Sequence, residues 1–308
     1  MRDRTIVITG ATSFIGSALI RRLLKEDTCR IVAVTAPDSL RKDRICQSDR
    51  VHIIESDLAD IDHIEPHCME NVDCIYHIGW TSRFANARYN LEGQIQNVVY
   101  LEKLIGWADK VGCKKILGVG SQAECGRISS ALSELTPDHP ETSYAVAKCR
   151  AYAKGMELCG RYGIKFFWPR LLSAYGPGDK MRTMIMSCLD AAVYKKKIEF
   201  TKCEQIWDYI YVDDVADALI KIVKEGDPGV KYTIASGQGR PLRDYICEIA
   251  EITGASWLLE GIGKRVYAED QVMYLTGDIQ RLAEDTGFEP KVSFDKGIKE
   301  TLRVDFTK

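Results

Sequence analysis

The chain has 308 residues, of which 45% are hydrophobic and 28% charged, and its formal net charge is −2. This composition is typical of a globular protein; it excludes the basic surface that nucleic acid or an anionic membrane would require, and no apolar run is long enough to span a bilayer. The eleven cysteines are odd in number, scattered and never spaced Cys-x-x-Cys, so we expect reduced thiols in a cytoplasmic protein, without disulfides or a metal site.

Short β-branched segments alternate with longer helical segments in the first half of the chain. The predicted strands, all expected to be buried, are Thr5–Thr9, Ile31–Thr35, His52–Ile54, Cys74–Ile78, Ile116–Val119 and Lys165–Trp168. The predicted helices, with apolar residues at i, i+3 and i+4, are Phe14–Lys25, Gln94–Lys110 and Ser143–Tyr162. The first strand begins so early that we expect no secretory signal. Strand–helix alternation predicts an α/β fold with a doubly wound parallel sheet.

The alternation loosens after about Pro169, where Gly176-Pro177-Gly178 marks a turn. We therefore expect a nucleotide-binding domain over residues 1–170 and a smaller C-terminal substrate-binding lobe mainly over residues 171–308. A segment at about 204–225 is expected to return to the first domain.

The loop after the first strand reads "TGATSFIG" over residues 9–16. Gly10 permits a tight turn, and Gly16 permits close packing of helix on strand. The N-terminus of the following helix attracts a pyrophosphate through its unpaired N–H groups. Ser13 replaces the middle glycine of such loops, but its side chain is small and its hydroxyl could donate to a phosphate. The alternative is a plain strand–turn–helix connection.

The second strand ends "VAVTAPDSLRK" and lacks the acidic residue that binds the adenosine ribose of NAD in many dinucleotide sites. No carboxylate would therefore repel a 2′-phosphate. Ser39, Arg41 and Lys42 follow closely and could bind one. Alternatively, Arg41 and Lys42 merely solvate a loop. The pattern favours NADP over NAD.

The segment "SYAVAKCRAY" carries Tyr144 and Lys148 four residues apart, on one face of a predicted helix. An ammonium about 4 Å from a phenol favours the phenolate by about 4 kcal/mol at an effective dielectric near 20, enough to bring a phenol into range for proton transfer. Ser121 follows the apolar strand "KKILGVG", at the sheet edge where ligands of doubly wound folds bind. By themselves, the pair could be an ordinary feature of a surface helix and Ser121 a turn serine.

Further segments occur in order and at consistent spacing: "SDLAD", "YHIGW", "GSQAECG", "WPRLLSAYGPGD", "WDYIYVDDVADAL", "GFEP" and "FDKGIKETL". With these, nearly the whole chain resembles the extended short-chain dehydrogenase/reductase family of Rossmann-fold proteins. Within that family it is similar to the branch of nucleotide-sugar epimerases, dehydratases and reductases.

The resemblance implies a division of labour at the site. Lys148 holds the nicotinamide ribose and makes Tyr144 more acidic, Tyr144 exchanges a proton with the sugar oxygen, and Ser121 polarises the carbonyl. The nicotinamide carries the hydride. The cofactor-binding residues implied by loop and resemblance together are Gly10, Thr12, Ser13, Phe14, Ile15, Gly16, Ser39, Arg41, Asp57, Leu58, Ile78, Gly79, Tyr144, Lys148, Pro169 and Ser173.

The serine segment departs from that of the family's sugar dehydratases, in which an acidic pair follows the active-site serine or threonine. Gln122 and Ala123 stand there instead, and neither can act as a general acid, so we do not expect dehydration. Glu124 lies one place further on and is expected to point elsewhere. The form "SQAECG" is similar to that of nucleotide-sugar ketoreductases, including enzymes that form abequose-type deoxysugars. A ketoreductase imports a hydride at each turnover, which suits NADPH, whereas epimerases retain bound NAD.

The substrate lobe is predicted less sharply. Trp207 stands where many relatives carry an arginine, and its indole either stacks on a base or fills the core. Arg182 and Arg265 are candidates to bind a pyrophosphate, with ordinary surface arginines as the alternative. Gln122 completes the candidate substrate-binding set.

Three other polar residues are expected to be structural. Asp213 and Asp214 precede a helical run and are predicted to cap it. His77 is the histidine nearest the cofactor and is expected to be a strand-end residue, not a base.

The two long helices pair in relatives across a two-fold axis, which implies a homodimer. The apolar residues that would serve such an interface, or would instead pack only on the sheet, are Val98, Leu101, Ile105, Val146 and Ala153.

The leading hypothesis is an NADP(H)-dependent reductase of a nucleotide-linked keto-sugar of the 4-keto-6-deoxy type. Its partner is a nucleotide-diphosphate sugar, with no nucleic acid and no membrane. The alternatives are an NAD-dependent nucleotide-sugar epimerase, a non-catalytic protein that senses the dinucleotide, and a flavonoid- or steroid-type reductase.

Overall fold

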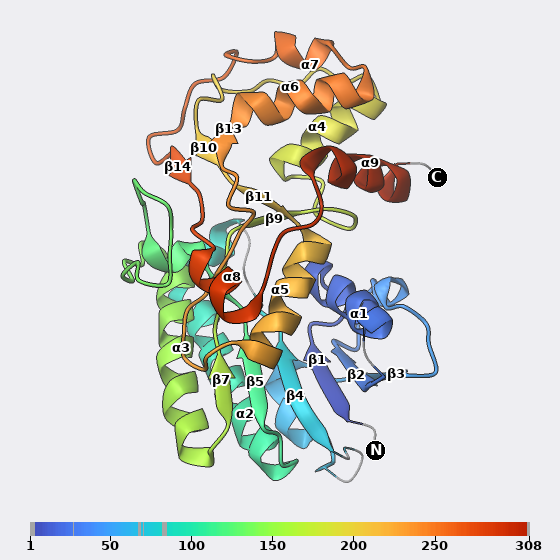
Figure 1. Cartoon of the computed structure of the whole chain (residues 1–308), viewed down its shortest axis with the longest axis vertical. Coiled ribbons are helices and arrows are strands. Elements are labelled where there is room, and N and C mark those ends of the chain that lie inside the picture. Colours follow the sequence, from blue (N-terminus) through green and yellow to red (C-terminus); the bar gives the residue numbers. More distant parts are fainter. Residues whose placement is uncertain (1–3, 27, 67–68, 70, 82–84, 307–308) are drawn as a thin grey trace.

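The computed structural model describes residues 4–26, 28–66, 69, 71–81 and 85–306. A parallel sheet flanked by helices forms the lower part of the molecule in Figure 1, and a smaller, mainly helical lobe lies above it. The strands of the sheet are β1 (Thr5–Thr9), β2 (Arg30–Thr35), β3 (Val51–Glu55), β4 (Val72–His77), β5 (Lys115–Gly118) and β7 (Lys165–Phe167). The helices of this part are α1 (Phe14–Glu26), α2 (Leu91–Lys110), α3 (Ser143–Tyr162) and α5 (Val212–Glu225).

The six strands run parallel in the order β3-β2-β1-β4-β5-β7. Side chains of β1 alternate between the two faces, as the pleat requires. Ile6 and Ile8 join the core beneath α1 and α5, whereas Val7 joins the core beneath α2 and α3. The predicted doubly wound sheet is therefore confirmed. Strand order reverses beside β1, and such a switch point opens the crevice where ligands of this architecture bind.

The ends of the two long helices follow from local capping. The side chain of Asn90 accepts the Gly93 N–H, so α2 begins at Leu91, three residues before the predicted start at Gln94. Thr142 caps α3 in the same way, and Gly163 ends it in the left-handed conformation, at the bounds predicted from the sequence.

The third strand corrects one expectation. His52 and Ile53 are exposed, Ile53 by 42%, although the run was expected to be buried. The reason is position: β3 is the edge of the sheet and has a neighbour on one side only.

The lobe is continuous with the core on one face of the sheet, where Leu19 and Leu219 belong to the same apolar cluster as Leu189 and Ile246. Helix α5 packs against α1, so this late segment lies with the sheet. The remaining strands are β6 (Gly120–Ser121), β8 (Arg170–Leu171), β9 (Ser173–Tyr175), β10 (Ile206–Trp207), β11 (Tyr209–Tyr211), β12 (Thr233–Ile234), β13 (Arg240–Pro241) and β14 (Tyr274–Leu275). The remaining α-helices are α4 (Met184–Val193), α6 (Leu242–Thr253), α7 (Trp257–Glu260), α8 (Gln280–Thr286) and α9 (Phe294–Asp305).

Short 3₁₀ helices complete the chain: η1 (Lys42–Arg44), η2 (Leu58–His63), η4 (Ala85–Tyr89) and η5 (Gln122–Cys125). Across the described ranges, no helix combines the length and the apolar character needed to cross a membrane.

Candidate active site

The loop between β1 and α1 is packed so tightly that two of its residues must be glycine. Gly10 has φ +69°, and a Cβ there would lie 2.7 Å from the backbone nitrogen of Gly79. A Cβ on Gly16 would lie 2.4 Å from the Gly10 carbonyl oxygen. The start of α1, the turn after β1 and the end of β4 are therefore held in direct contact, which leaves backbone N–H groups at the sheet edge.

Ser13, which replaces the middle glycine, caps the helix. Its Oγ accepts the Gly16 N–H at 3.1 Å, and its backbone N–H donates to Gly10 O at 2.9 Å. The cap satisfies one of the free donors of α1 and leaves the hydroxyl proton available to an anion. The N–H groups of Phe14 and Ile15 stand in the first turn, where the helix dipole favours negative charge. The loop thus retains the chemistry of a phosphate site.

Three hydroxyls gather where β2 ends. Thr12 Oγ1 lies 3.1 Å from Ser39 Oγ and 3.3 Å from Thr35 Oγ1. Arg41 follows Ser39 by two residues and is exposed, whereas Lys42 donates to Pro37 O and to Glu55. Two cations were considered for a 2′-phosphate. Lys42 is paired with Glu55, whereas Arg41 is exposed, so Arg41 is the better candidate.

The turn after β3 borders the same loop. The Leu58 side chain packs on Gly79, where an added Cβ would meet it at 3.1 Å, while Asp57 is exposed just before η2. Ile78, by contrast, is buried behind Gly79.

Lys148 lies one turn after Tyr144 on α3, with its ammonium nitrogen 5.7 Å from the Tyr144 ring centroid. The lysine is 5% exposed, donates to Val119 O at 2.6 Å and stands 3.5 Å over the Trp80 ring. The phenol ring also faces the guanidinium carbon of Arg88 at 4.8 Å. Positive charge close to the ring stabilises the phenolate that forms when Tyr144 gives up its proton.

Trp80 and Arg88 were missed in the sequence. Trp80 meets the Tyr144 ring edge-on at 6.1 Å, and its indole donates to Gln94 on α2. Both residues come from the connection between β4 and α2, where no periodic pattern marks a position as special. The "YHIGW" segment ends on Trp80 and is the one signal that could have found it.

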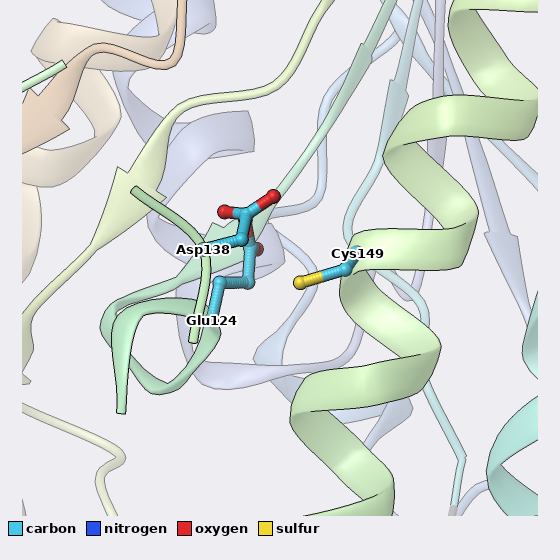
Figure 2. Close-up of side chains that lie close together, drawn as sticks. All are labelled: Glu124, Asp138 and Cys149. Carbon is cyan, nitrogen blue, oxygen red and sulfur yellow. The ribbon is translucent and has the colours of Figure 1, made fainter. Parts of the chain in front are cut away.

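Ser121 stands at the end of β6, immediately after β5. Its Oγ accepts the Ala123 N–H at 3.2 Å, and its own N–H donates to Glu124 Oε1 at 2.8 Å, which together form a capping box for η5. Glu124 is fully buried and turns toward Asp138 and the part of α3 that carries Cys149 (Figure 2). The expectation that Glu124 points away from the site therefore agrees with the structure. The spacing Ser-x-x-Glu was the signal for the capping box.

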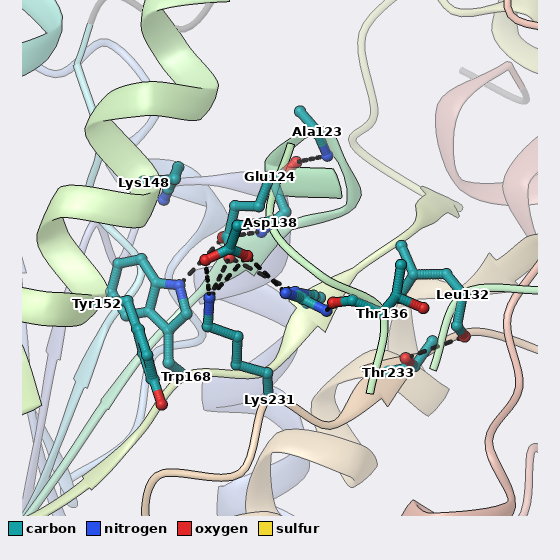
Figure 3. A network of polar contacts seen from close by, with 12 residues as sticks. Ala123, Glu124, Leu132, Thr136, Asp138, Lys148, Tyr152, Trp168, Lys231 and Thr233 are labelled. Atoms are coloured by element: carbon teal, nitrogen blue, oxygen red, sulfur yellow. Dashed lines mark hydrogen bonds and ion pairs between the residues drawn. The ribbon is translucent and has the colours of Figure 1, made fainter. Parts of the chain in front are cut away.

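Glu124 belongs to a network of charges in which Glu124, Arg170 and Lys231 are buried and Asp138 is exposed (Figure 3). Glu124 Oε1 also accepts the Trp168 indole N–H, and Glu124 Oε2 lies 3.6 Å from both Arg170 Nε and Lys231 Nζ. Lys231 and Arg170 each donate to Asp138, with closest distances of 2.6 Å. Burial would raise the pKa of Asp138, but the hydrogen bonds from Lys231 and then Arg170 outweigh it and lower that pKa.

The contacts of this network bear on the Glu124, Asp138 and Cys149 cluster and on the place of Arg170. Glu124, Asp138 and Cys149 place ligand atoms within 4.8 Å of one another, but the two carboxylates are already bound by Lys231 and Arg170, so the group is not arranged for a metal ion. Arg170, although it belongs to the segment that the resemblance places beside the nicotinamide, is 2% exposed and committed to the network. Pro169 accepts the Gly120 N–H at 2.8 Å and stays at the sheet edge.

His77 is a buried neutral side chain. Its Nδ1 lies 2.8 Å from Thr9 Oγ1, and burial, followed by the charge of Lys148, lowers the pKa of His77 to about 3. It is therefore uncharged at neutral pH, and a ring with so low a pKa is a weak base there.

The free energy of unfolding is expected to fall in mild acid because of His77. An unfolded histidine binds a proton below about pH 6.5, whereas this one resists protonation in the folded protein until about pH 3. Between these values the unfolded state binds more protons, so stability decreases as pH falls, by about 2 kcal/mol from pH 6.5 to pH 5. Denaturant titrations should show that His77→Asn removes this part of the slope. His52→Asn, at an exposed site, should leave it; equal slopes in the two variants would contradict the assignment.

The predicted substrate-binding residues are only partly brought together. The indole N–H of Trp207 donates to Ser173 Oγ at 2.8 Å, which links β10 to the segment after Pro169. Gln122 follows Ser121 directly at the start of η5. Arg182 and Arg265 are exposed, and among the described residues no hydrogen bond or ion pair ties their side chains to Trp207 or Ser121.

Asp213 and Asp214 do not cap α5, which corrects the prediction. Tyr211 occupies the cap position, and no side chain bonds there. Asp214 instead accepts the backbone N–H groups of Lys291 and Val292, both at 3.0 Å, and Asp213 pairs with Arg21 at 3.4 Å. Both aspartates join α5 to other elements.

The helix residues proposed for a dimer interface divide into two groups. Leu101 and Ile105 are fully buried within one subunit, so packing on the sheet accounts for them, and Val98 is 7% exposed. Val146 is half-buried and Ala153 is exposed on the outer side of α3. The homodimer stays a prediction.

Comparisons with known proteins agree with this geometry. A family model for the NAD dependent epimerase/dehydratase family matches residues 6–235. The chain is 26% identical over 315 residues to CDP-abequose synthase from Salmonella typhimurium, covering 97% of each. It is 28% identical over 181 residues to GDP-6-deoxy-D-mannose reductase from Pseudomonas aeruginosa, covering 56% of each. UDP-glucose 4-epimerase from Thermotoga maritima shares the fold with a TM-score of 0.86 and 22% identity, over 97% of this chain and 98% of that one.

Proposed function

Given that the chain belongs to the NAD dependent epimerase/dehydratase family and is a nucleotide-sugar-modifying enzyme of the extended short-chain dehydrogenase/reductase type, we propose that it is an NADP(H)-dependent reductase. Its proposed substrate is a nucleotide-diphosphate-linked 4-keto-6-deoxy sugar. The likeness to CDP-abequose synthase over nearly the whole chain supports this class of substrate.

The observation that carries the proposal is the chemistry around Ser121. Gln122 and Ala123 follow it and offer no carboxylate, and the nearest acid along the chain, Glu124, is fully buried and bound to Ser121 N–H and Trp168. Removing water from a sugar needs a positioned acid and base, which this segment does not present. Reduction of a carbonyl needs only a hydrogen-bond donor, a proton donor and a hydride.

The loop residues fit a dinucleotide. A Cβ at Gly10 or Gly16 would collide with backbone, so glycine at both positions is what allows the tight turn that ends at the N-terminus of α1. Ser13, Phe14 and Ile15 would hold its pyrophosphate at the start of α1, and Lys148 would hold its ribose. When bound, the cofactor supplies the hydride.

The side chains then act on the substrate. Ser121 donates a hydrogen bond to the carbonyl oxygen, and Tyr144 delivers the proton as that oxygen becomes a hydroxyl. Lys148 and Arg88 stabilise the phenolate left behind, and a solvent proton restores the phenol. The Trp80 ring makes a cation–π contact with the Lys148 ammonium, which helps to keep the ammonium next to the phenol.

Cofactor choice is a separate prediction. Arg41 follows the Ser39 hydroxyl, which contacts Thr12, by two residues and would bind the 2′-phosphate. Arg41→Ala should therefore weaken NADP binding about 10-fold, through loss of a charge-assisted hydrogen bond, and leave NAD binding unchanged. Arg30→Ala, at the opposite end of β2, is the matched control. Thermal-shift titrations with both dinucleotides measure the two affinities. Equal losses for NADP and NAD in Arg41→Ala would refute the role.

Turnover decides between reductase and epimerase. We expect the purified protein to consume one NADPH for each nucleotide keto-sugar reduced, with cofactor that exchanges freely. Protein that retains tightly bound NAD through purification, and consumes no NADPH on any keto-sugar, would refute the reductase and establish the NAD-dependent epimerase in its place.

A further inference from the structure

We propose that Glu124 is a positioning residue, which sets the orientation of Ser121 so that its hydroxyl donates to the substrate carbonyl. The inference rests on the proposed reductase function, because it concerns the donor at that same site. Glu124 itself touches neither substrate nor cofactor in this account; it acts through the backbone of Ser121.

The geometry links the two residues at both ends of one turn. Glu124 Oε1 accepts the Ser121 N–H at 2.8 Å, and Ser121 Oγ accepts the Ala123 N–H at 3.2 Å. Each bond fixes one torsional freedom of the serine: the first holds its backbone and the second its side-chain rotamer. Breaking the first bond would release the turn that presents Ala123 N–H to the hydroxyl.

The second bond also determines which way the hydroxyl proton points. A serine oxygen that accepts one N–H has its remaining lone pair and its proton directed elsewhere. Ser121 is half-buried at the sheet edge, so the proton remains available on the side where a substrate carbonyl would bind. A serine hydroxyl can either donate or accept a hydrogen bond. The capping box uses its accepting capacity, so that Ser121 is left to act as a donor.

The buried charges hold the glutamate in one place. Its carboxylate is 0% exposed, and its second oxygen lies 3.6 Å from both Arg170 and Lys231, which are themselves bound to Asp138. Ion pairs with these two cations therefore hold the Glu124 carboxylate in place. The ion pair with Lys231 connects Glu124 to a distant part of the chain, because Lys231 lies in the segment before β12.

Gly120 supplies the space that this carboxylate needs. A Cβ at Gly120 would lie 2.7 Å from both Glu124 Oε1 and the Trp168 indole nitrogen, and 2.9 Å from Pro169 O. The absence of a side chain at Gly120 thus allows the Glu124 carboxylate to approach the Ser121 N–H.

Two substitutions separate the reach of the side chain from its charge. Glu124→Asp keeps a negative charge for Arg170 and Lys231 but is one methylene too short to reach the Ser121 N–H. We expect kcat with NADPH and the keto-sugar to fall about 10-fold, since small displacements of a catalytic group have effects of this order or larger, while the Kd for NADPH is unchanged. Glu124→Gln retains an oxygen at the right reach, so kcat should stay within about threefold while Tm falls because the cations lose their partner.

Repeating both substitutions in a Ser121→Ala background makes the test specific. Ser121→Ala should lower kcat about 100-fold, as expected for loss of a donor to a developing oxyanion. With no hydroxyl left to orient, Glu124→Asp should then cause no further loss in kcat. A purely structural role would lower kcat by the same factor in both backgrounds.

The possible failures are distinguishable. If the parent protein consumes no NADPH on a keto-sugar, the proposed function fails. If Ser121→Ala retains full reductase activity, Ser121 is not the donor, and the positioning role is overturned while the reductase function stands. If Ser121→Ala is impaired but Glu124→Asp retains the parent kcat, or the two losses multiply, the positioning role is overturned. A loss of kcat that follows Tm across Glu124→Asp and Glu124→Gln would also overturn it.

Discussion

Tyr144→Phe is expected to lower kcat about 1,000-fold while leaving the Kd for NADPH near its parent value. The phenol delivers the proton to the sugar oxygen, and positioned proton donors contribute factors of this order. The ring itself, which packs against Trp80 and faces Arg88, remains in place, so the fold should be preserved. Initial rates of NADPH oxidation with a keto-sugar, alongside a cofactor titration, measure the two effects separately.

The control for this substitution is Tyr162→Phe, at the exposed end of the same helix α3. It removes a phenolic hydroxyl without touching the site, so kcat should not change. If Tyr144→Phe left the reductase activity intact, the role of Tyr144 as proton donor would be refuted. If the parent protein itself consumed no NADPH, a non-catalytic protein that senses the dinucleotide would be the correct interpretation.

Lys148→Met is expected to lower kcat by about 100-fold and to weaken NADPH binding as well. The ammonium favours the phenolate of Tyr144 across 5.7 Å to its ring, and the proposal also assigns it the cofactor ribose. Methionine keeps an unbranched apolar stem of similar length and removes the ammonium that stands over Trp80, so the loss should be electrostatic and not a loss of packing. A kcat effect without any change in NADPH affinity would contradict the ribose contact.

The same substitution has an independent readout in the pKa of His77. After burial, the Lys148 charge is the second cause that lowers this pKa, so Lys148→Met should raise it, as followed by NMR titration. Lys154→Met serves as the control on the same helix, because Lys154 pairs with Glu157 near the surface and should alter neither kcat nor the His77 titration.

Local patterns were sufficient to predict the sheet and the glycine loop. Gly16 is required by a contact within one strand–turn–helix unit, Gly10 takes a positive φ in the turn itself, and the bounds of α3 follow from Thr142 and Gly163 at its ends. Such features depend on neighbours in sequence, so a sequence pattern contains them. The exposure of β3 could not be predicted in this way, because an edge strand and a central strand can share one apolar pattern.

The parts that were missed depend on residues far apart in the chain. Lys231 and Asp138 are 93 positions apart, and Asp214 finds its partners at residues 291 and 292, so capping was the natural but wrong prediction from local context. Arg88 reaches Tyr144 from an irregular connection. The set of charges around Glu124 is likewise a property of the folded chain and has no signature in any one segment.

Deuterium transfer tests the central claim most directly. The protein would be given NADPH deuterated at the C4 position of its nicotinamide, together with a nucleotide-linked 4-keto-6-deoxy sugar, and the product analysed by mass spectrometry and NMR. The account predicts one deuterium on the carbon that bore the carbonyl, with one NADPH oxidised per product. A product that is epimerised without deuterium, while the labelled NADPH remains intact, would contradict it.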